Sequence, residues 1–127
     1  MGVKEMVFGI PVTKSGNVEE YDKAIDWYVH VLGFNLIWKM GIASLKLDNG
    51  QEILLFGEET DENSLWYASG SKLHSIQFTT DDIKELRTKL VQSGVEVGEI
   101  TMGGGGDQIM NFYDPHGNRF WAIQEQQ

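Results

Sequence analysis

The sequence predicts an α+β protein built from a strand–helix–three-strand unit that occurs twice. Two segments, 18–32 and 82–93, carry apolar residues at helical spacing, and a short strand-like segment precedes each of them. Gly33 and Gly94, which end these helices, lie 61 residues apart, while the later turns at Asp48 and Asp114 lie 66 residues apart. Such agreement indicates an internal repeat, and the glycine run in the second half accounts for the difference.

The first half begins with a strand at 7–12, in which alternate residues are apolar. Asn17 then caps a helix, with Glu20 three residues later as in a capping box, and Gly33 ends that helix near Leu32. The Asp-Asn-Gly sequence that starts at Asp48 is typical of a hairpin turn. Three strands are therefore expected after the helix, at 35–40, 42–47 and 51–56.

The second half repeats this order. A strand at 75–80 precedes a helix that Asp81 caps and Gly94 ends. Further strands are expected at 96–100, 109–114 and 119–124, with a glycine loop before the second and the Pro-His-Gly-Asn turn before the third. Between the halves, the acidic segment 57–72 has no regular period and is interpreted as a loop.

The composition excludes several kinds of protein. The net charge of −9 repels phosphate backbones and anionic membranes, so neither nucleic acid nor membrane is an expected partner, and it attracts cationic solutes. The chain has no cysteine, which excludes disulfides, thiolate metal sites and cysteine nucleophiles. There is no apolar run of membrane-spanning length and no signal-peptide pattern near Met1, so a cytoplasmic protein is expected.

At 127 residues the chain is expected to form a single domain, 1–127. Within it, module one covers about 5–57, a linker about 58–73, and module two about 74–125. One helix per module covers only one face of each sheet. The other face needs a covering, and a second half that closes over a cavity would supply it.

Three stretches of the chain are distinctive: IPVTKSGNVEEYDKAIDWYVHVLGF, IQFTTDDIKELRTKLVQSGVEV and GGGGDQIMNFYDPHGNRFWAI, and the Asp-Pro-His-Gly-Asn turn after Phe112 is the most specific part. Together they resemble the vicinal oxygen chelate superfamily, which includes glyoxalases, extradiol dioxygenases and bleomycin-resistance proteins. The resemblance implies two βαβββ modules that form an eight-stranded half-barrel with a concave binding face, and it implies a homodimer. Metal-dependent members of the family place His or Glu ligands on four strands of that face.

Carried over to this sequence, those four positions fall on Val7, Glu52, Ser75 and Trp121. Glu52 alone is a plausible ligand, whereas a catalytic metal site needs about three protein ligands. His74, one residue before Ser75, is expected to face away from the cavity, because neighbours on a strand point in opposite directions. We therefore expect no metal and no cofactor.

Strand alternation separates the core from the cavity. Phe120 and Ala122 should face the helix together with Met110 and Phe112, whereas Trp121 should face the cavity. The full set of expected ligand-binding residues combines aromatic, aliphatic and polar side chains, as small-molecule pockets do. It comprises Trp121, Glu52, Leu54, Phe56, Ser75, Gln77, Thr79, Asn111, Tyr113 and Ile123, beside Val7 and Gly9, with Trp66 from the acidic loop.

Several alternatives remain open for these residues. Trp121 either forms a wall of the pocket or plugs the barrel, and Glu52 is a metal ligand, a general base or a structural acid. Trp66 and Tyr67 either cover the site or pack on a dimer partner. His116, in the turn, is expected to be solvent-exposed, and His30 to be a packing or surface residue.

Two classes of function follow. The first is a metal-free binder of the bleomycin-resistance type, which holds a hydrophobic or aromatic small molecule that can also be cationic, because an indole face binds planar rings and cations. The alternative is a metal-dependent lyase, isomerase or dioxygenase of the same superfamily that uses Glu52 as ligand or base. A third possibility is that the concave face is merely packed.

Overall fold

The computed structural model describes residues 2–126, with the exception of the side chain of Trp66. The chain divides into two compact units between Glu62 and Asn63, inside the segment expected to be a linker. We refer to the residues up to Glu62 as the first module and to those from Asn63 onward as the second module. No helix among the described residues is long and apolar enough to cross a membrane.

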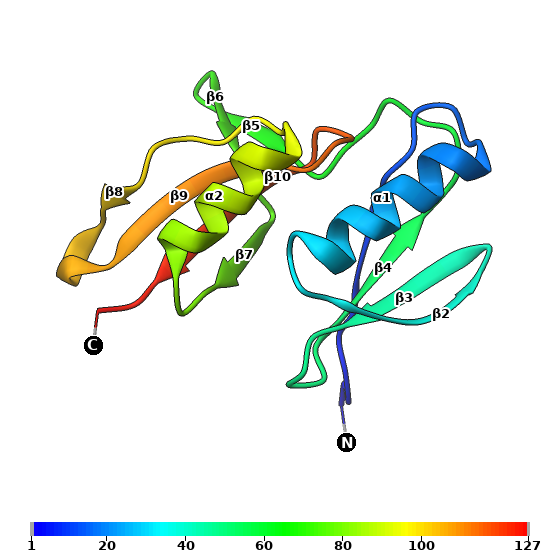
Figure 1. Ribbon diagram of the computed structural model, residues 1–127, viewed down its shortest axis with the longest axis horizontal. Coiled ribbons are helices and arrows are strands. Elements are labelled where there is room, and N and C mark those ends of the chain that lie inside the picture. The colour runs from blue at the N-terminus through cyan, green and yellow to red at the C-terminus, as the bar shows by residue number, and fades with distance from the viewer. Residues whose placement is uncertain (1, 127) are drawn as a thin grey trace. The chain divides into compact units, whose positions relative to one another are not determined.

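Both modules contain a βαβββ unit with the same order of elements and the same sheet topology. The first contains β1 (Phe8–Pro11), α1 (Val18–His30), β2 (Asn35–Met40), β3 (Ile42–Lys46) and β4 (Glu52–Phe56), with the strands in the order β1-β4-β3-β2. The second contains β7 (Ile76–Thr79), α2 (Ile83–Ser93), β8 (Thr101–Met102), β9 (Gln108–Tyr113) and β10 (Arg119–Gln124), in the order β7-β10-β9-β8. The predicted α+β class and its two βαβββ modules are therefore confirmed, and each helix lies across one face of its own sheet (Figure 1).

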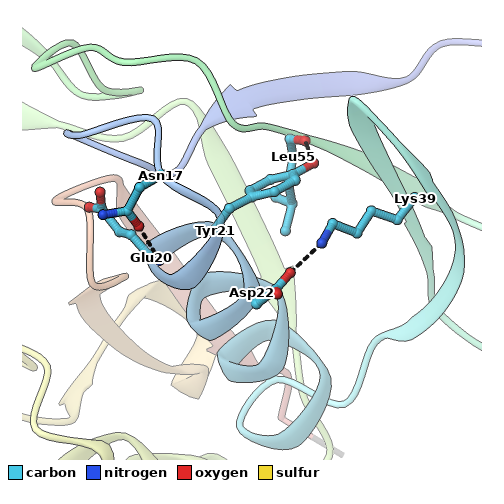
Figure 2. Close-up of polar contacts among 6 residues, drawn as sticks. All are labelled: Asn17, Glu20, Tyr21, Asp22, Lys39 and Leu55. Carbon is cyan, nitrogen blue, oxygen red and sulfur yellow. Dashed lines mark hydrogen bonds and ion pairs between the residues drawn. The ribbon is translucent and has the colours of Figure 1, made fainter.

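Helix α1 begins as its sequence predicts. The Asn17 side chain accepts a hydrogen bond of 2.8 Å from the backbone N–H of Glu20, which satisfies one of the free donors of the first turn (Figure 2). The Glu20 carboxylate in turn accepts bonds of 2.9 Å from the backbone N–H groups of Lys14 and Ser15, and this fixes the entering loop. The helix ends at His30, an exposed residue, two residues before the predicted end.

Tyr21 fastens α1 to its sheet. Its hydroxyl donates a 2.7 Å hydrogen bond to the carbonyl oxygen of Leu55 in β4, and the residue is only 6% exposed (Figure 2). Its ring lies against Gly57, where an added Cβ would be 3.1 Å from ring atoms. Burial raises the pKa of the Tyr21 hydroxyl, so this group stays a donor. On the outer side, Asp22 and Lys39 form an ion pair that joins α1 to β2.

The core of the second module is aromatic and follows the predicted alternation. Phe112, Phe120 and Ala122 are 0% exposed and Met110 is 1% exposed. The ring of Phe78 lies 5.1 Å from that of Phe120, and the rings of Phe112 and Phe120 are 5.5 Å apart. These residues face α2, whose Ile83 and Leu90 are fully buried. The expected core positions of Phe120 and Ala122 on β10 are therefore confirmed.

Helix α2 begins one residue later than expected. Asp82, and not Asp81, is its N-cap, and the Asp82 carboxylate accepts a 3.0 Å hydrogen bond from the N–H of Glu85. Two adjacent aspartates precede Ile83, so composition alone could not choose between them. The predicted end is confirmed, since Gly94 has a φ of +85°, the left-handed conformation that favours glycine at a helix C-terminus.

Two segments differ from the prediction. The segment interpreted as a loop contains a hairpin, β5 (Trp66–Ala68) and β6 (Ser71–Leu73). Its two turn residues, Ser69 and Gly70, have φ values of +51° and +80°, as a type I′ turn requires. In contrast, the strand expected at 96–100 is reduced to an isolated bridge between Val97 and Phe112, and the regular strand is β8.

The turn between β9 and β10 is held by a buried carboxylate. Oδ1 of Asp114 accepts hydrogen bonds of 2.9 Å from the N–H groups of both His116 and Asn118, and Oδ2 accepts one of 2.8 Å from the Asn118 side chain. Oδ1 of Asn118 accepts a 2.7 Å hydrogen bond from the N–H of Ser64, which lies just before the β5–β6 hairpin, so the chain entering that hairpin is held to this turn. The expectation that His116 is exposed is wrong: it is 4% exposed, and its backbone N–H is held by the Asp114 carboxylate.

Replacing Tyr21 by phenylalanine removes the donor to the Leu55 carbonyl. We expect Tyr21→Phe to lower the free energy of unfolding in urea by about 1–3 kcal/mol, the usual cost of leaving a buried polar group without its partner. The control is Tyr67→Phe, because Tyr67 is 63% exposed. Equal changes in the two variants would contradict the role given to the buried hydroxyl.

Replacing Asp114 by alanine leaves three N–H donors without their acceptor. We expect Asp114→Ala to lower the free energy of unfolding by at least about 3 kcal/mol. Asp81→Ala is the matched control, since Asp81 is exposed and its side chain has no hydrogen bond or ion pair among the described residues. A loss no larger than that of the control, measured by urea denaturation, would show that the turn does not depend on this carboxylate.

Candidate functional site

Each sheet has a far face, which we define as the face opposite its own helix. In the first module, register pairs Leu54 of β4 with Gly9 on one side and with Ser44 on the other, so these three residues share the far face. The ring of Phe56 occupies the space beside Gly9: a Cβ built there would lie 2.3 Å from Cε2 of the ring. The missing side chain at Gly9 thus allows the Phe56 ring to lie across the sheet.

A bulge in β2 adds an aromatic residue to this far face. Register pairs Leu36 with Leu45 but Trp38 with Ser44, so Ile37 is the extra residue. Because paired residues share a face, Leu36 lies on the helix side and Trp38 lies on the far side. Sequence alternation alone does not show this shift. Trp38 is 45% exposed.

Glu52 is engaged within the chain. Its carboxylate accepts a hydrogen bond from the hydroxyl of Ser44, which is 0% exposed, and register places it opposite Lys46. The other three positions at which metal-dependent relatives place ligands hold Val7, Ser75 and Trp121, none of which offers a carboxylate or an imidazole. Among residues 2–126, no group of three or more His, Asp or Glu side chains could hold a metal ion. These residues do not fit a catalytic metal.

On the far face of the second module, Trp121 stands in the middle of a row across three strands. Register pairs it with Gln77 of β7 and with Asn111 of β9. The next row along β10 consists of Ile123, Thr79 and Ile109, and the preceding one pairs Arg119 with Tyr113. Five of the expected ligand-binding residues, Gln77, Thr79, Asn111, Tyr113 and Ile123, are thus brought beside Trp121 on one face.

Two of the expected residues need separate description. Ser75 precedes the first residue of β7, and its hydroxyl donates a 2.6 Å hydrogen bond to the carbonyl oxygen of Ser64, so it supports the hairpin segment. Trp66 belongs to β5, but its side chain lies outside the described residues. Contact of any of these residues with a ligand stays a prediction.

Two cations converge on Tyr113. The guanidinium carbon of Arg119 lies 5.9 Å, and the Nζ of Lys72 lies 5.7 Å, from the centre of the Tyr113 ring, which are cation–π distances. Nη1 of Arg119 also donates a 2.9 Å hydrogen bond to the backbone carbonyl of Lys72. The hairpin is therefore attached to β10, and it brings a positive charge to this face.

His74 meets Trp121, contrary to expectation. The ring centres are 4.7 Å apart at an interplanar angle of 64°, an edge-to-face contact. The predicted orientation, away from the cavity, is wrong because His74 lies between β6 and β7, outside any strand, so strand alternation does not apply to it. Burial, followed by the charge of Arg119, lowers the pKa of His74, so its imidazole is neutral at pH 7.

Arg119, Lys72 and His74 are absent from the set of residues that sequence reasoning selected. A signal for Arg119 was available, because it lies two residues before Trp121 on a strand and so shares its face. Lys72 and His74 had no such signal. They depend on a short hairpin in a segment without apolar periodicity. The assembled surface can stack a planar ring on an indole and can donate hydrogen bonds beside two positive charges.

Comparisons with known proteins agree with this fold. Residues 15–122 match the model of the Glyoxalase/Bleomycin resistance protein/Dioxygenase superfamily. A comparison with curated proteins finds no match.

Among solved structures, the chain is similar to TnmS3, an antibiotic-binding protein from Streptomyces sp. CB03234, with a TM-score of 0.72 and 21% identity over 99% of both chains. It is also similar to a bleomycin resistance determinant encoded on transposon Tn5, with a TM-score of 0.66 and 16% identity over 98% of this chain and 100% of that chain. A lactoylglutathione lyase from Agrobacterium tumefaciens has a TM-score of 0.64 and 19% identity, over 95% of this chain and 92% of that chain.

At these identities the structural similarities show the fold, which binders and an enzyme share. The family match rests on the sequence itself, and residues 15–122 include parts of both modules. The chain belongs to the Glyoxalase/Bleomycin resistance protein/Dioxygenase superfamily.

Proposed function

We propose that this protein binds a hydrophobic or aromatic small molecule on the far face of the second module, without a metal ion. The observation that carries this proposal is Trp121, an indole in the middle of a polar row formed with Gln77 and Asn111. An aromatic surface with a few hydrogen-bonding groups is the usual composition of a small-molecule site. The family's metal-dependent chemistry would need a ligand where Trp121 stands.

Two of the similar structures support a binding role. TnmS3 is described as an antibiotic-binding protein, and the Tn5 protein as a bleomycin resistance determinant. The metal-dependent alternative has less support, because the Glu52 carboxylate is already bonded to the buried Ser44. The single-domain boundaries, the eight-stranded half-barrel and a cytoplasmic location remain predictions of the sequence.

We also propose that the protein forms a homodimer through the β2 edge of the first module. This edge strand exposes an unusual amount of apolar surface: Ile37 is 50%, Trp38 is 45% and Met40 is 84% exposed. Apolar residues concentrated on one sheet edge favour association with another chain, and a second copy is the commonest partner. The bulge at Ile37 interrupts regular strand pairing, so packing of side chains is expected to contribute more than a continued sheet.

The binding proposal predicts a specific loss in the Trp121→Phe variant. A panel of planar aromatic compounds should quench the tryptophan fluorescence of the native chain. In Trp121→Phe the quenching should largely disappear and the affinity should fall by about three- to tenfold, as expected for a weaker aromatic contact. Trp27→Phe is the control, because Trp27 lies on α1 and is 7% exposed. If no compound quenches the native protein, or if both variants lose quenching equally, the proposal fails.

The dimer proposal predicts the mass in solution. The native chain should sediment as a dimer, and Met40→Lys should sediment as a monomer, because a charge at an edge opposes association. Met102→Lys is the matched control, since Met102 is a 66% exposed methionine on the edge strand β8 of the other module. A native chain that is monomeric at all concentrations, or dissociation in both variants, would exclude the β2 edge as the interface.

A further inference from the structure

Two buried N–H groups on β10 have no acceptor among the residues that the structure describes. They are Nε of Arg119 and Nε1 of Trp121. The two residues are separated by one position on the same strand, so both side chains lie on the far face of the second module. Buried donors are nearly always satisfied, and an unsatisfied pair on one face indicates that a hydrogen-bond acceptor from outside the chain completes them.

The charged side chains beside these donors indicate whether the acceptor is positively or negatively charged. Lys72 and Arg119 both approach the Tyr113 ring, and neither forms an ion pair with a carboxylate anywhere in the described part of the chain. Two adjacent cations without a counter-charge favour an anion. The acidic groups that give the chain its charge of −9 form no ion pair with either cation among the described residues, and salt screens charges more than about 8 Å apart at physiological ionic strength.

Nearby side chains limit how the ligand can lie. The Tyr113 ring is already contacted by the two cations, so it does not offer a stacking surface to the ligand. The part of the Trp121 ring that contacts His74 is not available to a ligand. The remaining indole surface of Trp121, together with the side chains of Gln77 and Asn111 in the same row, is where the apolar body of a ligand would lie.

We propose that the ligand is an aromatic or hydrophobic carboxylic acid, whose carboxylate accepts hydrogen bonds from Arg119 Nε and Trp121 Nε1 and is neutralised by Arg119 and Lys72. Charge-assisted bonds from a guanidinium to a carboxylate are stronger than neutral ones, and they fix the orientation of the acid. The inference rests on the proposed binding function and narrows its ligand class. It reverses the preference for cations that the net charge alone suggests.

A set of three ligands with one ring system tests the charge preference directly. Calorimetry would compare 2-naphthoate, 2-naphthamide and 2-naphthylmethylammonium, which differ in charge and share the naphthalene ring. We expect the native chain to bind the carboxylate at least about tenfold more tightly than either of the others, a difference typical of one charged hydrogen-bonded pair.

The assignment to Arg119 is tested by substitution. Arg119→Gln should remove the preference for 2-naphthoate over 2-naphthamide, whereas Arg119→Lys, which keeps the charge, should retain part of that preference. Arg87→Gln is the matched control. Its guanidinium also donates to a backbone carbonyl, that of Gly98, but it lies at α2 beside Glu99. Thermal unfolding of each variant would show that the fold is intact.

A second readout does not depend on affinity. An anion near His74 stabilises the imidazolium form, so saturating 2-naphthoate should raise the pKa of His74 in a proton NMR titration, while 2-naphthamide should not. His74→Gln identifies the resonance, and the resonances of His30 and His116 serve as internal references. No rise in the pKa of His74 with the bound carboxylate would overturn the inference.

The outcomes separate this inference from the function on which it rests. If the analogues bind without preference for the carboxylate, or if Arg119→Gln keeps that preference, the inference is wrong and the binding function stands. If none of the three analogues binds, the proposed binding function fails and the inference fails with it.

Discussion

The second module depends on the carboxylate of Asp114. Its two oxygens accept hydrogen bonds from two backbone N–H groups and one side-chain amide within the turn. This closes the β9–β10 hairpin at the residue where β10 must begin, and so it sets which side of β10 carries Phe120 and which carries Trp121. Asn118 extends the same network to Ser64. The Asp-Pro-His-Gly-Asn turn, the most specific part of the family resemblance, therefore sets the positions of both the core and the candidate site.

Further hydrogen bonds hold the β5–β6 hairpin and the residues just before it. Ser64 is held by Asn118 and by Ser75, and the backbone of Lys72 is held by Arg119. These few polar bonds bring a lysine and a histidine to a sheet face that would otherwise hold an indole and neutral polar groups. Because each bond ends on a backbone group, its geometry depends on the path of the chain more than on the side chains of the hairpin.

Much of the fold could be predicted from the sequence, because long apolar patterns decide it. Strands such as Asn35–Met40 and Arg119–Gln124 have the predicted bounds, and the core positions of Phe120 and Ala122 follow from alternation. The errors occur where short-range geometry or tertiary bonds decide. Three-residue strands have too little pattern to detect, and His116, which is buried, lies in a turn where no periodic pattern applies. The candidate site was predicted only in its strand residues for the same reason.

The β5–β6 hairpin has one further consequence. A duplicated fold has two sheet faces of the same topology. The hairpin lies before β7 in the second module, and the described residues of the first module contain no such hairpin, so the two sheet faces differ. Changes in the length or sequence of this one connection would therefore alter the charges beside the second sheet while both βαβββ units stay as they are.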